Sequence, residues 1–430
     1  METDPNPGTL ISFLKEAQRL DEIDPLSVMR GRFYLPRNTI YLDGNSLGPL
    51  SRDAEAALAT AIESWKTLLI EGWTAGDSPW FTLAERLGAR TGTLLGAEAE
   101  SVVITGSTTV NLHQVLATLL PSVLNERSVV MDEAAFPSDV YAVRSALAGR
   151  GLNVETVLHL VPTDASGLLP EKALINAMEG AKFVVLPAVV YTTGQLLDMQ
   201  RLTAAAHDAG SLIGFDCAHS VGSVPHKLDE WGVDFAFWCS YKYLNAGPGA
   251  SGGLYLNRRH WNSTPGLAGW FGTNKAMQLQ MLPVMEPAPG VGRLQIGTPN
   301  ILSMAPLEGS LKVIEEAGLA NMRTKSIEQT SFMMSMLTDE IHNGLINVVT
   351  PEDASKRGGH ISIKHPGAAG LSQALRARGV IPDFRPPDIL RLAPAPLYTT
   401  FQDCYEAIRQ IKELLNSPGD WQHITPGIVP

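Results

Sequence analysis

The stretch Ala181-Lys-Phe-Val-Val-Leu186 is followed by Leu202-Thr-Ala-Ala-Ala-His-Asp-Ala209 and then by Ser211-Leu-Ile-Gly-Phe-Asp216. The two outer segments are short apolar runs, which is typical of strands buried on both faces. The middle segment reads as a helix, and Gly210 is a favourable residue for its C-terminal end. A strand, a helix and a strand in this order predict a parallel pair with a crossover helix.

The same alternation extends outward from this stretch. Further strands are expected at Ser101–Thr105, Ser128–Met131 and Asn153–Val157, and helices at Ala54–Leu69 and Thr109–Leu120. The pattern predicts an α/β fold whose large domain has a mostly parallel sheet covered by helices.

A Pro/Gly-rich stretch, residues 283–299, separates this pattern from the rest of the chain. Helices are expected beyond it at Ser303–Glu316, Thr324–His342 and Tyr405–Leu415, within a smaller α+β C-terminal domain. We therefore expect a large domain over residues 41–294 and a small domain over 295–430. Residues 1–40 are expected to pack with the small domain.

The composition excludes several classes of protein. The chain has 430 residues, 44% of them hydrophobic and only 18% charged, which argues against disorder. Its net charge of −11 argues against a general nucleic-acid binder. Cys217, Cys239 and Cys404 lie far apart, so neither a zinc site nor a disulfide framework is expected. With no signal-peptide pattern and no apolar run long enough to span a membrane, a cytoplasmic protein without a metal or membrane partner is expected.

Polar clusters follow several predicted strands, where ligands bind in open α/β sheets. The clusters are Gly106–Thr109, Phe136–Asp139, Phe215–His219 and Ser240–Lys242, the last preceding a glycine-rich loop. Each has an ordinary explanation when taken alone. The first and third are compatible with plain helix N-caps, the second with a turn, and Lys242 with a surface lysine.

Taken together, the four clusters point to one kind of chemistry. Hydroxyls and free amides at a helix start suit a phosphate, and Phe136 suits the face of a planar ring. Asp216 is placed to pair with a protonated pyridine nitrogen, while Lys242 in a partly desolvated pocket suits a Schiff-base nucleophile. These are the components of a pyridoxal 5′-phosphate site, in which the cofactor acts as an electron sink.

Several motifs resemble those of the kynureninase family. The resemblance covers residues 30 to 415 and is carried by these stretches: Tyr41-Leu-Asp-Gly-Asn-Ser-Leu-Gly48, Phe136-Pro-Ser-Asp139, Gly232-Val-Asp-Phe-Ala236, Trp238-Cys-Ser-Tyr-Lys-Tyr-Leu-Asn245, Gly269-Trp270, Ile301-Leu-Ser-Met304 and Gly379–Pro394. Related cysteine desulfurases usually carry His, Gln or Arg before the lysine, whereas this chain has Tyr241. One departure is Pro187, which stands where relatives carry Ser or Thr and has neither a hydroxyl nor a backbone donor.

The resemblance implies an aspartate-aminotransferase-like fold that works as a homodimer with active sites at the interface. It implies hydrolytic Cβ–Cγ cleavage of L-kynurenine to anthranilate and L-alanine by an aldimine and ketimine route, with no metal. That reaction belongs to tryptophan catabolism, the kynurenine pathway and NAD biosynthesis, although a secondary-metabolite pathway would look alike.

The resemblance also implies roles for individual residues. Lys242, Tyr241 and Asp216 are the expected catalytic residues, with Tyr241 as a proton-transfer partner. Arg391 is expected to receive the substrate α-carboxylate, and Asn45 to contact the substrate. The expected cofactor-binding residues are Thr108, Thr109, Phe136, Ser138, Asp139, Asp216, His219, Tyr241, Lys242, Trp270 and Thr298.

Trp73 and Thr298 correspond to the positions where relatives that prefer 3-hydroxykynurenine carry His and Asn. A tryptophan leaves little room for a ring hydroxyl, so a preference for unsubstituted L-kynurenine is expected. The alternative is that Trp73 is a dimer-interface core residue, and a 3-hydroxykynurenine-preferring hydrolase stays open.

Two other classes of function also stay open. Another pyridoxal-phosphate reaction, such as cysteine desulfuration or transamination, needs different machinery; a desulfurase needs a reactive cysteine on a mobile loop, and Cys404 lies in a helical pattern. A non-enzymatic binding module has no need to keep Lys242, Asp216 and Arg391 together. His360 and Ser362 either line the site from the small domain or lie on a strand face.

Overall fold

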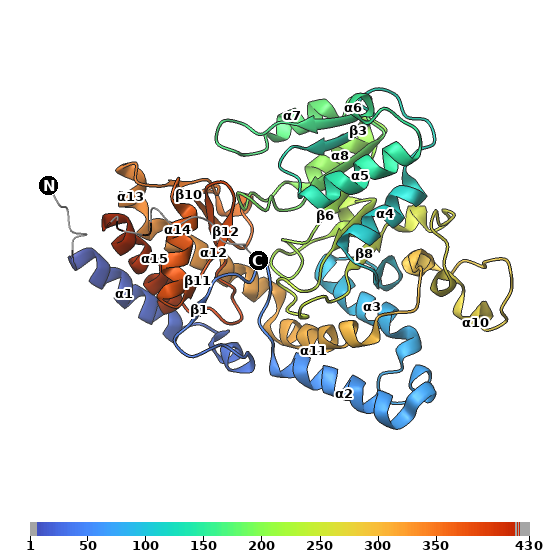
Figure 1. Ribbon diagram of the computed structural model, residues 1–430, viewed down its shortest axis with the longest axis horizontal. Helices are drawn as coiled ribbons and strands as arrows, with labels where there is room; N and C mark the ends of the chain where they lie inside the picture. The colour runs from blue at the N-terminus through green and yellow to red at the C-terminus, as the bar shows by residue number, and fades with distance from the viewer. Residues whose placement is uncertain (1–6, 418, 420, 422–430) are drawn as a thin grey trace.

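The computed structural model describes residues 7–417, 419 and 421, and they form two bodies that lie side by side (Figure 1). The larger body is built around a seven-stranded sheet with the order β2-β8-β7-β6-β5-β3-β4. Its strands are β2 (Val102–Ile104), β3 (Val129–Asp132), β4 (Leu158–Val161), β5 (Phe183–Pro187), β6 (Leu212–Asp216), β7 (Phe235–Trp238) and β8 (Gly253–Leu256).

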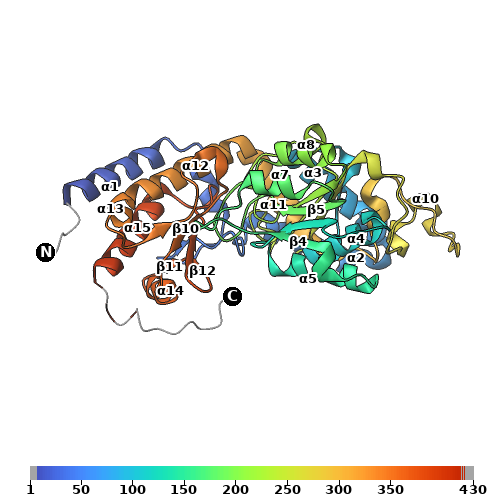
Figure 2. The same cartoon turned by 90° about the horizontal axis from the view of Figure 1, so that it is seen from above.

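Within this sheet β8 alone runs antiparallel to its neighbours, β2 and β7. The pairs β3–β4, β3–β5, β5–β6 and β6–β7 are parallel. Parallel strands of this kind need cover on both faces, and Figure 2 shows helices on both sides of the sheet. These helices are α2 (Arg52–Leu68), α3 (Leu83–Leu95), α4 (Thr108–Leu119), α5 (Pro137–Gly149), α6 (Val154–Val157), α7 (Glu171–Ala177), α8 (Met199–Asp208), α9 (Leu228–Trp231) and α11 (Ile301–Ala317).

The prediction of a strand over Asn153–Val157 is wrong. The side chain of Asn153 accepts a hydrogen bond from the backbone N–H of Glu155 and so caps the one-turn helix α6. The edge strand β4 begins immediately afterwards, at Leu158, and pairs with β3. A local capping interaction therefore overrides the β-branched composition of this segment.

The smaller body contains a four-stranded antiparallel sheet with the order β12-β13-β10-β9. A two-stranded parallel pair, β1–β11, lies beside it. The strands are β1 (Ile40–Tyr41), β9 (Asn347–Val348), β10 (Ile361–Lys364), β11 (Val380–Ile381), β12 (Asp383–Arg385) and β13 (Ile389–Leu392). The helices are α1 (Pro7–Glu22), α12 (Leu319–Met336), α13 (Thr338–His342), α14 (Ala368–Ala377) and α15 (Phe401–Asn416).

Two hydrophobic cores divide the chain at a different place from the sequence-based boundary. Helix α11 packs along α2 (Figure 1), and Leu307, Leu311 and Ile314 belong to the core of the large sheet. In the second core, Phe332 and Met333 of α12 join Ala17 of α1, which packs on α15, whereas Met322 near the start of α12 belongs to the first core. We therefore propose that the small domain begins within α12 and that α1 and β1 pack with it, whereas Leu26 and Phe33 of the N-terminal segment pack in the core of the large domain.

One segment projects from the large body. It carries α10 (Lys275–Gln278) and lies at the edge farthest from the small domain in both views (Figures 1 and 2). Leu279, Met281 and Val284, which follow α10, are each at least 69% exposed. Within the described residues, no helix has the length and apolar character that crossing a membrane requires.

Candidate active site

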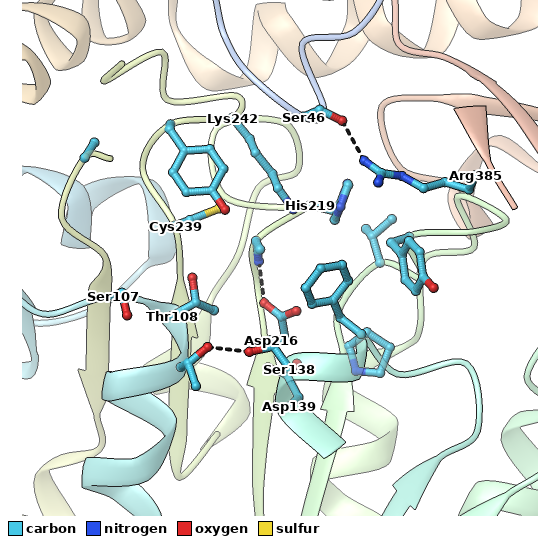
Figure 3. Close-up of a pocket in the computed structure, with 18 of the residues that line it drawn as sticks. Ser46, Ser107, Thr108, Ser138, Asp139, Asp216, His219, Cys239, Lys242 and Arg385 are labelled. Carbon is cyan, nitrogen blue, oxygen red and sulfur yellow. Dashed lines mark hydrogen bonds between the residues drawn. The ribbon is translucent and has the colours of Figure 1, made fainter. Parts of the chain in front are cut away.

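A cavity of about 340 Å³ lies at the carboxyl ends of the parallel strands, where the large sheet meets the small domain. This is the edge at which open α/β sheets bind ligands. Figure 3 shows side chains from both domains pointing into it. The lining residues are Ser46, Ser107, Thr108, Thr109, Phe136, Ser138, Asp139, Pro187, Val189, Tyr191, Asp216, Ala218, His219, Cys239, Tyr241, Lys242, Ala250, Arg385 and Arg391.

Lys242 projects into this cavity just after the end of β7. Its Nζ lies 2.9 Å from Nε2 of His219 and 6.0 Å from the centre of the Phe136 ring. Both neighbours come from other strand ends of the same sheet. Since a lysine amine close to a neutral imidazole and an aromatic face is well placed to react with a carbonyl group, Lys242 is the candidate nucleophile.

The helix start after β2 is a candidate anion-binding corner. Ser107 is the N-cap of α4, and its side chain accepts a hydrogen bond from the backbone N–H of Val110. The capping role therefore falls to Ser107, and the neighbouring Thr108 and Thr109 line the cavity. The hydroxyl of Thr109 also makes a short hydrogen bond with that of Ser138 at the start of α5 (Figure 3). Hydroxyls at a helix N-terminus favour a bound phosphate.

Two carboxyl groups share the floor of the cavity. Asp216 accepts a hydrogen bond of 2.8 Å from the backbone N–H of Ala218, and Asp139 is its carboxyl neighbour. Burial, together with the charge and hydrogen bond of Asp216, raises the pKa of Asp139 well above its usual range. Burial also raises the pKa of Asp216, although the charge of Lys242 opposes this. Two adjacent carboxyls cannot both ionise cheaply, so the pair retains a proton. Neither carboxyl forms an ion pair with a described residue, although the charge of Lys242 acts on both.

A third buried carboxyl, Asp132 at the end of β3, escaped the sequence analysis. Its side chain is fully buried, and burial raises its pKa to about 7. Neither of its carboxyl oxygens makes a hydrogen bond of normal geometry with any residue from 7 to 417. The strand-end rule that selected Asp216 applies equally to Asp132, so the signal was present in the sequence.

His219 and Tyr241 flank the reactive lysine. Burial and the charge of Lys242 hold the pKa of His219 well below its ordinary value, so its imidazole is neutral. Burial and the neighbouring Cys239 thiol raise the pKa of Tyr241, which keeps its hydroxyl protonated. Tyr241 is thus a proton donor, and His219 is a hydrogen-bond acceptor for Lys242.

The small domain supplies two arginines to the cavity. Arg391 donates to the backbone carbonyl of Tyr191 at 2.8 Å and to the hydroxyl of Ser46 at 3.3 Å, and it forms an ion pair with Asp383. Arg385 donates to the same Ser46 hydroxyl at 3.1 Å (Figure 3). Guanidinium groups in a buried pocket suit a carboxylate. The sequence analysis gave no role to Ser46 or Arg385, although both lie in motifs quoted for the family resemblance.

Four other predicted site residues do not line the cavity of their own chain. Trp73 packs against Trp80 and Phe271, with ring centres 5.7 and 5.9 Å apart. Trp270 is 46% exposed, Thr298 is also exposed, and Asn45 is fully buried beside the cavity. Their predicted contacts with cofactor or substrate remain predictions.

Comparisons with solved structures show the same fold. A cysteine desulfurase from Thermococcus onnurineus matches with a TM-score of 0.76 over 91% of this chain and 98% of that one, at 19% identity. A mutant of C-DES with glycine covalently linked to its PLP cofactor matches with a TM-score of 0.75 over 89% and 98%, at 18% identity. These matches show that the chain has an aspartate-aminotransferase-like fold.

Sequence comparisons narrow this class to one family. The model of the kynureninase C-terminal domain matches residues 322–411. A kynureninase of Geobacillus thermodenitrificans is 48% identical over 95% of this chain and 96% of its own, and one of Shouchella clausii is 46% identical over 93% of each chain. The chain belongs to the kynureninase family, as its motifs predicted.

Proposed function

We propose that the protein is a pyridoxal 5′-phosphate-dependent hydrolase that cleaves the Cβ–Cγ bond of L-kynurenine to give anthranilate and L-alanine. Family membership supports the reaction. The observation that carries the proposal is the position of Lys242, which projects from a strand end between His219, the ring of Phe136 and the carboxyl pair.

The residues around Lys242 fit the cofactor group by group. Thr108, Thr109 and Ser138 would hold the phosphate at the start of α4. Phe136 would cover one face of the ring. The Asp216–Asp139 pair lacks a cation, and a protonated pyridine nitrogen would supply it. The bound group supplies an electron sink that stabilises negative charge at the substrate Cα.

Three side chains would act on the substrate itself. Lys242 would take and return the proton at Cα. Tyr241, whose hydroxyl is kept protonated by burial, would donate a proton to Cβ, which keeps the electron pair when water adds at Cγ and the Cβ–Cγ bond breaks. Arg391 would bind the α-carboxylate, with Arg385 beside it; burial lowers the pKa of Arg391 to about 10, so it stays charged near neutral pH. These roles orient the amino acid with its side chain directed away from the small-domain arginines.

We further propose that the enzyme is a cytoplasmic homodimer. The projecting segment around α10 exposes Leu279, Met281 and Val284 in a short run, which is unusual for a surface that water alone covers. Trp270 and Thr298 are exposed on the same body, away from the cavity of their own chain. A second copy would cover these groups and bring them into its own site. Sedimentation should give a dimer, and a monomeric active enzyme would contradict this arrangement.

Cysteine desulfuration is the less favoured alternative. Cys404 is fully buried within α15, and Cys239, which lines the cavity, is 5% exposed with its pKa raised by burial. Neither thiol has the exposed, activated character that sulfur transfer requires. If the protein is a hydrolase of this kind, the alternative is that it prefers 3-hydroxykynurenine to L-kynurenine as substrate.

Turnover of L-kynurenine by the purified protein, followed by anthranilate release, tests the proposal. Borohydride reduction and peptide mapping should place the cofactor label on Lys242. Lys242→Ala should lose both label and turnover, whereas Lys227→Ala, at an exposed lysine of the same domain, should keep both. A label on another lysine, or alanine and anthranilate absent from the wild-type reaction, would refute the assignment.

A further inference from the structure

His360 is a buried imidazole that the proposed reaction does not use. It immediately precedes β10 of the small domain and is fully buried. Neither ring nitrogen makes a hydrogen bond of normal geometry with any residue the structure describes. Gly194, at φ +75°, packs closely against it: a Cβ added to Gly194 would lie 2.7 Å from the His360 carbonyl oxygen and 3.3 Å from its Nε2. A polar ring enclosed in this way is costly unless it has a partner.

The partner on one side is His219, which belongs to the large domain. The two ring centres lie 5.8 Å apart, with the planes inclined at 57°. Nε2 of His219 lies 2.9 Å from Nζ of Lys242, whereas Nδ1 is buried and makes no hydrogen bond with the described residues. A lysine ammonium can only donate, so Nε2 must accept and the ring proton of neutral His219 must lie on Nδ1. That Nδ1–H needs an acceptor.

His360 also lies near the backbone of Tyr191. Burial and the charge of Arg391 lower the pKa of His360 to about 3, although the backbone of Tyr191 acts in the opposite direction. Since His360 is neutral, one ring nitrogen carries a proton and the other is a free acceptor. The Tyr191 carbonyl also accepts from Arg391 at 2.8 Å. The polar groups therefore run from Arg391 through Tyr191, His360 and His219 to Lys242.

We propose that His360 is a positioning residue that fixes the tautomer of His219. Its free ring nitrogen accepts the Nδ1 proton of His219 through one bridging water, and the other nitrogen donates towards the Tyr191 carbonyl. The ring centres are 5.8 Å apart, the separation of packed aromatic neighbours, so the bridging water would lie at the ring edges, where His219 Nδ1 and a His360 nitrogen without a hydrogen-bond partner would be its two partners. His219 then presents Nε2 as an acceptor and directs the Lys242 amine into the cavity. The effect of His360 on catalysis rests on the proposed function, whereas its effect on the tautomer of His219 is independent of that function.

The tautomer can be measured without any turnover. The full-length protein, with ¹⁵N-labelled histidine rings and before cofactor is added, should show His219 with its proton on Nδ1; a His219→Gln variant identifies the signal. In His360→Leu, which offers neither donor nor acceptor, the Nδ1–H form should lose its dominance. His360→Gln, which offers both, should restore it. An Nε2–H tautomer in the wild type, or an unchanged ring in His360→Leu, overturns the proposal.

A packing control separates this role from a structural one. Ile361 is the next residue and is also fully buried, but it packs in the core of the small domain. Ile361→Ala should lower the melting temperature without changing the His219 signals. In the holoenzyme, His360→Leu should lower kcat for kynurenine about five- to tenfold, the size of one hydrogen bond, and His360→Gln should recover most of it. If the tautomer responds as expected but no variant or wild type cleaves kynurenine, the proposed function fails and the positioning role stands.

Discussion

Asp216, which is partly buried at the end of β6, and Asp234, which is fully buried just before β7, lie at opposite edges of the same sheet. Asp234, just before β7, accepts hydrogen bonds from the backbone N–H of Ile213 and from the rings of His207 and His260. Burial alone raises its pKa, but these bonds outweigh burial and hold the pKa below its ordinary value. Asp216 has one backbone donor and a carboxyl neighbour, and its pKa is raised.

The difference separates a structural charge from a functional one. The amino edge of the sheet satisfies Asp234 with three hydrogen bonds, whereas at the carboxyl edge no described residue forms an ion pair with Asp216. Arg357 and Arg391 repeat the contrast in the small domain, where both side chains are about 1% exposed. Arg357 donates to Thr330, Ser331 and the backbone of Glu352. Nε of Arg391, by contrast, makes no hydrogen bond with the described residues.

Exchanging each aspartate for asparagine tests the comparison most strongly. Asp216→Asn should lower kcat on the order of 10²–10³-fold, because the ring of the cofactor loses its anionic partner, with little loss of stability. Asp234→Asn should leave kcat intact and lower the free energy of unfolding by about 2 kcal/mol, because the partly buried His207 and His260 lose a charged acceptor. Steady-state kinetics and urea unfolding measure both. Equal effects of the two variants on kcat would contradict the assignment of Asp216 to function and of Asp234 to structure.

The two arginines give the next largest effect. Arg391→Ala should raise KM for the amino acid by a factor equivalent to about 2 kcal/mol, roughly 30-fold, because the α-carboxylate is left unpaired. Arg391→Lys should recover this only in part, since an ammonium lacks the bidentate geometry. Arg357→Ala should lower the melting temperature and leave KM unchanged in the enzyme that stays folded. A normal KM in both Arg391 variants would move the carboxylate site elsewhere.

The pH dependence of stability reports the unsatisfied charges at the carboxyl edge. The pKa of Asp132 is about 7 in the fold and near 4 when unfolded, so the folded state binds the extra proton. Stability should therefore rise as the pH falls from 7 to 5, by about 2 kcal/mol from this group, in protein without added cofactor. Urea unfolding of Asp132→Asn should lack that contribution. Glu133→Gln is the control, because a hydrogen bond from the Thr163 backbone lowers the pKa of Glu133 and gives it the opposite sign.

Whether a site residue could be predicted from the sequence depends on the element to which it belongs. Lys242, Asp216, Phe136 and Thr109 follow strands of one parallel sheet, so the strand-end rule brings them together without tertiary information. Ser46 and Arg385 reach the cavity from the N-terminal segment and from β12, and no local pattern reports such a long-range meeting.

The fold shows the same limit. Apolar runs predicted most strands of the large sheet, but the one-turn helix α6 depends on the single side-chain bond of Asn153. The place of α11 depends on packing along α2, which a helical pattern does not encode. Local periodicity therefore predicts elements well, whereas capping and packing decide their ends and their domain.

The smallest expected effect concerns the aryl end of the substrate. Trp73 packs against Phe271, whose ring also contacts exposed Trp270, so in the proposed dimer this apolar cluster would reach a substrate bound in the other subunit. An apolar wall rejects an added hydroxyl only weakly, so the wild type should favour L-kynurenine over 3-hydroxykynurenine by about tenfold, close to 1.4 kcal/mol. The double variant Trp73→His, Thr298→Asn should shift the ratio of kcat/KM towards the hydroxylated substrate, whereas Trp231→His in α9 should not. A wild type that already prefers 3-hydroxykynurenine would refute the steric argument and favour a secondary-metabolite role.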